Sequence, residues 1–282
     1  MKRRDFLRIA GAGAALCTLP GQAMAGYARV RPKRRNRLDS DQEYANYLDK
    51  IRLFDRDHPG DFQLDQERMT LLNATADRFR RLQKLVGFAN FTLLGFDRGL
   101  RFAKRYPQVG SFTREELDFL EMIFSEQASL YGFFGDKPLK QITARIPRRE
   151  VVKIPRTGNY LYKGSPQKTY ERIRRDVGDR VILTSGVRSV VKQFLLFLSK
   201  AQETKGNLSR ASRALAPPGY SFHGISDFDV GQVGFGALNF TERFVTTDVF
   251  RQLRDLGHVN LRYPRDNSLG VRFEPWHVKV TS

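Results

Sequence analysis

Cysteine is almost absent from this 282-residue chain, which contains only Cys17. Cys17 falls in an amino-terminal segment that we expect to be removed, so the mature protein should have neither disulfides nor a thiolate metal site. Histidine is scarce as well, with four residues. Any tightly held metal ion would therefore need imidazole and carboxylate ligands.

Long apolar runs are missing too. The longest candidate, residues 9–19, is rich in Gly and Ala and only weakly apolar. A membrane-spanning helix needs about 20 apolar residues, and this run is far shorter. We therefore expect no membrane span in the mature protein.

The first 25 residues show the order of features that is typical of an export signal. Arg3 and Arg4 precede Phe-Leu and a further basic residue, as in the twin-arginine motif, and the alanines at positions 23 and 25 suit a signal peptidase. We predict a twin-arginine signal peptide over residues 1–25, cleaved before Gly26. The twin-arginine export machinery would then be a partner, and the periplasm the location. The alternative is a cytosolic protein with a basic amino terminus.

Acidic side chains are also in short supply: 30 acids face 49 Lys and Arg, a net charge of +19. The predicted leader holds three of these charges, which leaves +16 for the remainder. Such a surface attracts polyanions, which include nucleic acid, anionic lipid and anionic wall polymers. Export argues against nucleic acid, and we expect none as a partner. The charge describes the surroundings of the protein and not its chemistry.

The chain after the leader begins with a linker and a helical region. Residues 26–40 are basic and poor in apolar groups, which indicates a flexible linker. Residues 41–145 favour helices, because apolar side chains recur at helical spacing from Leu72 to Val86. Thr113 and Glu116 form a capping box before another amphipathic run.

Residues 146–282 have a different sequence pattern, in which short β-branched runs alternate with turn residues. We expect strands at 181–183 and 228–230, helices at 189–200 and 248–256, and one or two further strands within 271–280. This order predicts an α+β fold, with a small, largely antiparallel sheet and flanking helices after the helical amino-terminal region.

Two of the four histidines lie near acids in segments rich in turn residues. His223 precedes Asp227 and Asp229, which alternate onto one side of a short strand, and Glu274 precedes His277 by three positions. Two His and one Asp would make a three-ligand zinc site with an open position for water, and the Glu could act as general base. Either half alone is a weak signal, because a histidine near an acid usually makes an ordinary hydrogen bond.

The two histidines belong to blocks that occur in the order found in a known family. Together these blocks resemble the VanY-type zinc D-alanyl-D-alanine carboxypeptidases, relatives of the vancomycin-resistance dipeptidases and of the hedgehog signalling domain. The resemblance covers about residues 180–280. Its blocks are residues 184–189 (TSGVRS), 216–223 (APPGYSFH), 261–264 (LRYP) and 273–277 (FEPWH).

The resemblance implies a hedgehog/D-Ala-D-Ala peptidase-like zinc domain that removes terminal D-alanine from peptidoglycan stem peptides ending in D-Ala-D-Ala. By position, His223, Asp229 and His277 match the zinc ligands, and Glu274 matches the catalytic base. Arg188 matches the arginine that grips the substrate's terminal carboxylate, for which a guanidinium is well suited.

Two further residues in or between these blocks are candidates for substrate binding. Ser221 is interpreted as a hydrogen-bonding partner of the substrate or of the metal ligands. Gln193 follows the first block on a predicted helix. Its side chain either points into the cleft or lies at the surface.

The chain departs from the family pattern at two places. His223 and Asp229 are six positions apart where seven are usual, so Asp227 is a rival ligand, and Val187 stands where the family has tyrosine. These departures leave other interpretations open. One is a wall peptidase of different cut, such as a dipeptidase, L,D-carboxypeptidase or endopeptidase, and another is a non-catalytic wall-binding module on the same fold.

Overall fold

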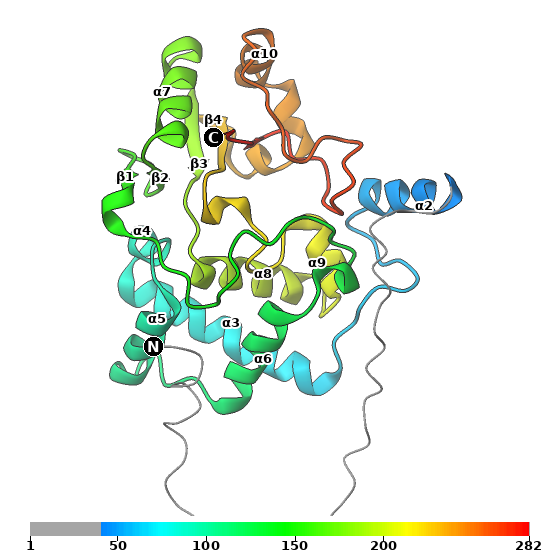
Figure 1. Ribbon diagram of the computed structural model, residues 1–282, viewed down its shortest axis with the longest axis vertical. Helices are drawn as coiled ribbons and strands as arrows, with labels where there is room; N and C mark the ends of the chain where they lie inside the picture. Colours follow the sequence, from blue (N-terminus) through cyan, green and yellow to red (C-terminus); the bar gives the residue numbers. More distant parts are fainter. Residues whose placement is uncertain (1–40, 282) are drawn as a thin grey trace, which may run out of the picture. The chain divides into compact units, whose positions relative to one another are not determined.

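The computed structural model describes residues 41–281, so the predicted signal peptide (1–25) and linker (26–40) lie outside the described residues. Figure 1 shows the elements, coloured by their order in the sequence. The α-helices are α2 (Asp41–Arg52), α3 (Gln66–Val86), α4 (Phe88–Phe91), α5 (Phe96–Arg105), α6 (Arg114–Ser125), α7 (Ser165–Val177), α8 (Val190–Glu203), α9 (Leu208–Ala214) and α10 (Asp248–Asp255). The 3-10 turns are η1 (Ala128–Tyr131), η2 (Arg148–Glu150), η3 (Phe222–Gly224), η4 (Gly236–Phe240) and η5 (Glu242–Thr246). The strands are β1 (Val151–Lys153), β2 (Tyr160–Tyr162), β3 (Val181–Ser185), β4 (Phe228–Gln232) and β5 (His277–Val278).

The largest core cluster joins α3 to α8 (Figure 1). Both helices begin at the residues that their sequences favour: Asp65 caps α3, and Ser189 caps α8. Phe79 of α3 stacks on Phe194 of α8, with ring centroids 6.0 Å apart. The helical amino-terminal region and the segment after residue 146 therefore bury their apolar side chains in one common core.

The helical pattern of the amino-terminal region is confirmed as far as Ser125. Thr113 caps α6 and forms the predicted capping box with Glu116. From residue 126 to 145, the only helical element of the described chain is the 3-10 turn η1. This turn ends at Gly132, which has the left-handed backbone that glycine adopts readily (φ 78°).

Two antiparallel sheets confirm the α+β prediction. β1 pairs with β2, and a three-stranded sheet has the order β3-β4-β5. Helices α7 and α10 bury their apolar faces against the three-stranded sheet, where Ile173, Val230 and Leu253 share one cluster. The strand β4 lies in the middle of the larger sheet.

The prediction of one or two strands within residues 271–280 is confirmed by one strand, β5. Pro275 lacks the N–H that a ladder needs. The backbone also turns here, since the His277 N–H donates to the carbonyl of Glu274 at 3.1 Å. This turn brings Glu274 and His277 close together in space.

None of the helices within residues 41–281 is both long and apolar enough to cross a membrane.

Candidate metal centre

Asp229 lies in the central strand of the larger sheet and is paired on both sides. Its partner in β3 is Ser185, next to an irregularity in the ladder, and its partner in β5 is His277. Directly paired residues on antiparallel strands place their side chains on the same face of the sheet. The sheet register therefore brings together Asp229 and His277, which are far apart in sequence.

His223 reaches this face from the turn η3. Its backbone carbonyl accepts a hydrogen bond from the N–H of Arg188 at 3.0 Å, which ties the turn to the segment after β3. The ring Nδ1 lies 2.8 Å from the carbonyl oxygen of Gly186. A carbonyl can only accept, so Nδ1 carries the proton and Nε2 faces the other way.

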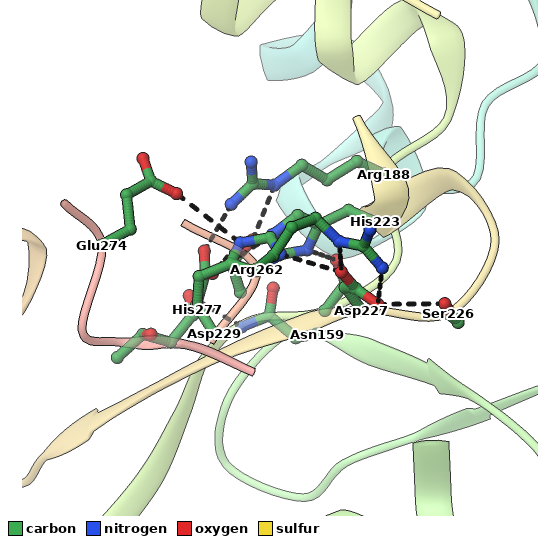
Figure 2. A network of polar contacts seen from close by, with 12 residues as sticks. Asn159, Arg188, His223, Ser226, Asp227, Asp229, Arg262, Glu274 and His277 are labelled. Atoms are coloured by element: carbon green, nitrogen blue, oxygen red, sulfur yellow. Dashed lines mark hydrogen bonds and ion pairs between the residues drawn. The ribbon is translucent and has the colours of Figure 1, made fainter. Parts of the chain in front are cut away.

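The three predicted ligands converge (Figure 2). Oδ1 of Asp229 lies 3.2 Å from Nε2 of His223 and 3.1 Å from Nδ1 of His277. One donor atom from each residue lies within 4.8 Å of the other two, and all three side chains are buried. We call His223, Asp229 and His277 the donor cluster.

Asp227, the rival ligand, contacts the opposite side of His277. Its Oδ2 lies 3.0 Å from Nε2 of that ring, and it also pairs with Arg262. Asp227 is thus adjacent to the donor cluster and outside it. The geometry favours Asp229 as the carboxylate ligand.

Glu274 lies beside the donor cluster, with Oε2 3.6 Å from Nδ1 of His277. Glu274 is only 7% exposed. Burial, which penalises the charged carboxylate, raises the pKa of Glu274 to about 7. A carboxyl group with such a pKa can take up and release a proton near neutral pH.

The two imidazoles have opposite electrostatic surroundings. Burial, together with the positive charge of Arg188, lowers the pKa of His223 to about 4. Burial acts in the same direction on His277, but the hydrogen bonds and charges of Asp227 and Asp229 outweigh it and raise its pKa to about 9. The donor cluster therefore contains one imidazole that resists protonation and one that favours it.

The three predicted substrate-binding residues lie around the donor cluster in different ways. Nη2 of Arg188 pairs with Oδ2 of Asp229 at 2.5 Å, and its Nε donates to Ser185 at 2.9 Å. Ser221 is buried at the residue before η3. Gln193 is 2% exposed, which excludes the surface alternative.

The amide of Gln193 is bonded to the main chain at both ends. Its Nε2 donates to the carbonyl of Arg188 at 3.0 Å, and its Oε1 accepts from the N–H of Gly219 at 2.8 Å. This side chain therefore connects the first and second blocks of the sequence. A role toward substrate remains a prediction for Gln193, Ser221 and Arg188.

Val187 is 2% exposed and packs in a small apolar cluster with Val151 and Tyr160. The cluster lies against β1 and β2. The side chain at position 187 therefore contributes to this apolar packing, which the departure from the family pattern did not indicate.

Other residues that shape the site were not singled out from the sequence. A Cβ atom on Gly186 would lie 2.0 Å from the carbonyl oxygen of Tyr160, so only glycine fits. The hydroxyl of Tyr162 donates to the carbonyl of Gly224 at 2.6 Å. Gly186 stands in a quoted block and could have been noticed there, whereas Tyr162 lies outside every block and carries no local signal.

The donor cluster fits a zinc ion by its chemistry. Two imidazole nitrogens and one carboxylate oxygen are a known catalytic ligand set that leaves a coordination position open. The outward-facing nitrogen of each ring has an acceptor, Gly186 O for His223 and Asp227 for His277. Such outer partners orient metal-binding histidines.

Three solved structures resemble part of the chain. A mutant of the vancomycin-resistance D,D-pentapeptidase VanY from a VanB-type cassette, in complex with Zn(II), is 23% identical with a TM-score of 0.39, over 49% of this chain and 83% of that one. VanYB in complex with D-alanine-D-alanine is 24% identical with a TM-score of 0.39, over 49% and 81%. The LdcB LD-carboxypeptidase is 21% identical with a TM-score of 0.36, over 43% and 59%.

Among curated proteins, no sequence matches the chain. A sequence family does match: residues 169–281 agree with the family described as VanY, D-alanyl-D-alanine carboxypeptidase. This range contains the donor cluster, Glu274 and Arg188. Over residues 169–281, the chain is therefore similar to the VanY family of D-alanyl-D-alanine carboxypeptidases.

Proposed function

We propose that this protein is a zinc-dependent D,D-carboxypeptidase that removes the terminal D-alanine from peptidoglycan stem peptides ending in D-Ala-D-Ala. One observation carries the proposal: His223, Asp229 and His277 converge with Glu274 only 3.6 Å from His277. The match of residues 169–281 to the VanY family supports the substrate class. The predicted periplasmic location would bring the enzyme to that substrate.

Zinc would be held by Nε2 of His223, Nδ1 of His277 and a carboxylate oxygen of Asp229. When bound there, zinc supplies Lewis acidity toward the scissile carbonyl and acidifies water at neutral pH.

Glu274 is the proton carrier in this proposal. Its pKa of about 7 lets the carboxylate accept a proton from the attacking water. The same carboxyl group can then donate that proton to the amine of the leaving D-alanine. Its burial keeps bulk water from competing for the proton.

Arg188 would provide selectivity for a free carboxyl end. Its side chain is 11% exposed, and its guanidinium is held in place by Asp229 and Ser185. A cation that is fixed before the substrate arrives loses little entropy on pairing with a carboxylate. Peptides that lack a free terminal carboxylate would not gain this contact.

Incubation with defined stem peptides tests the function. We expect pentapeptide stems to lose one D-alanine by mass, the activity to vanish with a chelator, and added zinc to restore it. Release of a dipeptide, cleavage of an L,D bond or internal cleavage would identify a wall peptidase of different cleavage specificity. Peptide binding without hydrolysis, even with zinc present, would identify a non-catalytic module.

A further inference from the structure

Asp227 is a buried carboxylate that the proposed reaction does not use. Its side chain is fully buried, yet both of its oxygens have donors. Oδ1 accepts from the Ser226 hydroxyl at 3.0 Å and from the Val280 N–H at 3.1 Å. Oδ2 faces Nε2 of His277 at 3.0 Å. A carboxylate so completely bonded has a fixed position.

The contact with His277 determines which ring nitrogen faces the donor cluster. An ionised carboxylate can only accept, so Nε2 of His277 carries the proton that Asp227 receives in the hydrogen bond. Nδ1 then points toward Asp229, 3.1 Å away. His223 has the reverse arrangement, with Nδ1 toward Gly186 and Nε2 toward Asp229.

Arg262 also contacts Asp227, and it shares the Oδ2 atom with His277. Its guanidinium donates to both oxygens of Asp227, through Nε to Oδ2 and through Nη2 to Oδ1 at 3.3 Å. The same guanidinium lies 3.4 Å from the ring centre of Phe222. Phe222 immediately precedes His223, and Asp227 contacts His277, so Arg262 contacts one neighbour of each histidine ligand.

The backbone completes a closed chain of contacts around the donor cluster. The N–H of Asp227 donates to the carbonyl of Phe222 at 3.1 Å, which fixes the short connection between His223 and β4. Leu261, next to Arg262, forms a bridge with Val278 beside His277. Movement of Arg262 would therefore disturb both imidazoles.

We propose that Asp227 and Arg262 are positioning residues of the metal centre: Asp227 orients His277 so that Nδ1 faces the donor cluster, and Arg262 holds Asp227 in place. The proposal rests on the zinc-dependent function proposed above. It explains how the connection between His223 and Asp229, one residue shorter than the family pattern, still supports the cluster.

Zinc affinity of the full chain, measured by competition with a chromophoric chelator, provides the first test. Loss of such an outer partner costs about 10- to 100-fold in metal affinity, which we expect for Asp227→Ala and Arg262→Gln. Arg265→Gln is the matched control, since Arg265 also pairs with an acid and lies over a phenylalanine ring, but at an exposed site. The control should bind zinc as the wild type does.

The protonation pattern of the histidines provides a second readout that a merely structural role would not change. With only four histidines, selective ¹⁵N-histidine labelling gives a readable spectrum. In the zinc-loaded wild type we expect opposite tautomers, with the proton on Nδ1 of His223 and on Nε2 of His277. Asp227→Ala should remove the single fixed state of His277.

The outcomes separate this proposal from the proposed function. Failure of the wild type to bind zinc would overturn both. A wild type that binds zinc with the same tautomer in both histidines would overturn only the positioning role. So would unchanged affinity in folded Asp227→Ala. If that variant does not fold, unchanged affinity in Arg262→Gln overturns the positioning role, and weakened affinity supports it.

Discussion

Glu274 differs at the residue scale from most acids of the chain, because it is buried and its ion-pair partner is a histidine. Most acids with described ion pairs face arginines at the surface, such as Glu242 with Arg265. Glu274 instead contacts His277 at 3.6 Å, and its pKa is raised to about 7. A buried carboxyl group with a raised pKa beside a metal-type donor cluster is typical of a general base.

We expect Glu274→Gln to lower the rate of D-alanine release by about 100- to 10,000-fold, because an amide cannot carry the proton. Zinc content should stay at the wild-type level, since Glu274 is not one of the three donors. Release assays and metal analysis of the same preparations measure both quantities. Glu242→Gln, at the exposed pair, should leave the rate unchanged, and a fully active Glu274→Gln would contradict the assigned role.

Gly186 is a second position where one atom matters. We expect Gly186→Ala to lower the free energy of unfolding by about 1–3 kcal/mol, because its Cβ would lie 2.0 Å from the Tyr160 carbonyl oxygen. Urea unfolding measures the change. Gly99→Ala is the control: its Cβ would meet Leu82 at 3.4 Å, an ordinary contact, and alanine favours a helix. Equal effects of the two substitutions would argue against the steric explanation.

At the scale of elements, one side chain both begins α6 and joins it to α3. Glu116 closes the capping box with Thr113. Its carboxylate also accepts hydrogen bonds from two nitrogens of Arg78 in α3: Nε donates to Oε2 at 2.9 Å, and Nη2 donates to Oε1 at 3.0 Å. The Glu116 side chain is 2% exposed. The capping box could be predicted from Thr113 and Glu116 because the motif is local. The partner Arg78 could not, because it depends on how the two helices pack.

Glu116→Ala should therefore cost more than the loss of a helix cap. Removal of one partner from a buried ion pair costs about 3–5 kcal/mol, because the remaining charge is left without compensation. Thermal or urea unfolding checks this value. Glu115→Ala, one position earlier and exposed, should have a much smaller effect. A cost of only about 1 kcal/mol would mean that the cap alone accounts for the role of Glu116.

At the scale of the whole molecule, an ion pair joins the connection after α2 to α9. Asp61 pairs with Arg213 through both carboxylate oxygens, at 2.7 Å and 2.8 Å. Burial acts to raise the pKa of Asp61, but hydrogen bonds from Arg213, Asn207 and the His58 N–H outweigh it and hold this pKa well below its ordinary value of 3.8. The pair thus favours the folded state whenever Asp61 is ionised.

The pH dependence follows from the direction of this shift. A carboxyl group whose pKa is lower in the folded state stabilises fully above its unfolded pKa, and this contribution disappears as the pH falls through the folded value. Asp61→Asn should therefore reduce the unfolding free energy clearly at about pH 7 and progressively less below about pH 4. Urea titrations across this range measure the difference. Asp55→Asn, at an exposed acid, should show no such trend.

The sequence by itself determined the helix starts at Thr113 and Ser189, the α+β class and the two histidines of the donor cluster. Caps and apolar periodicity depend on neighbours along the chain, so they can be read without a fold. The family blocks indicated His223 and His277 because their order along the chain is itself a signal.

Only the tertiary structure favours Asp229 over Asp227 as the carboxylate of the donor cluster. Both follow His223 closely in sequence. The sheet register pairs Asp229 with His277, whereas Asp227 precedes β4 and is held by Arg262 from another segment. The bonding of Gln193 to two separate main-chain segments was equally hidden. Register and side-chain pairing depend on residues far apart in sequence, and no local pattern contains that information.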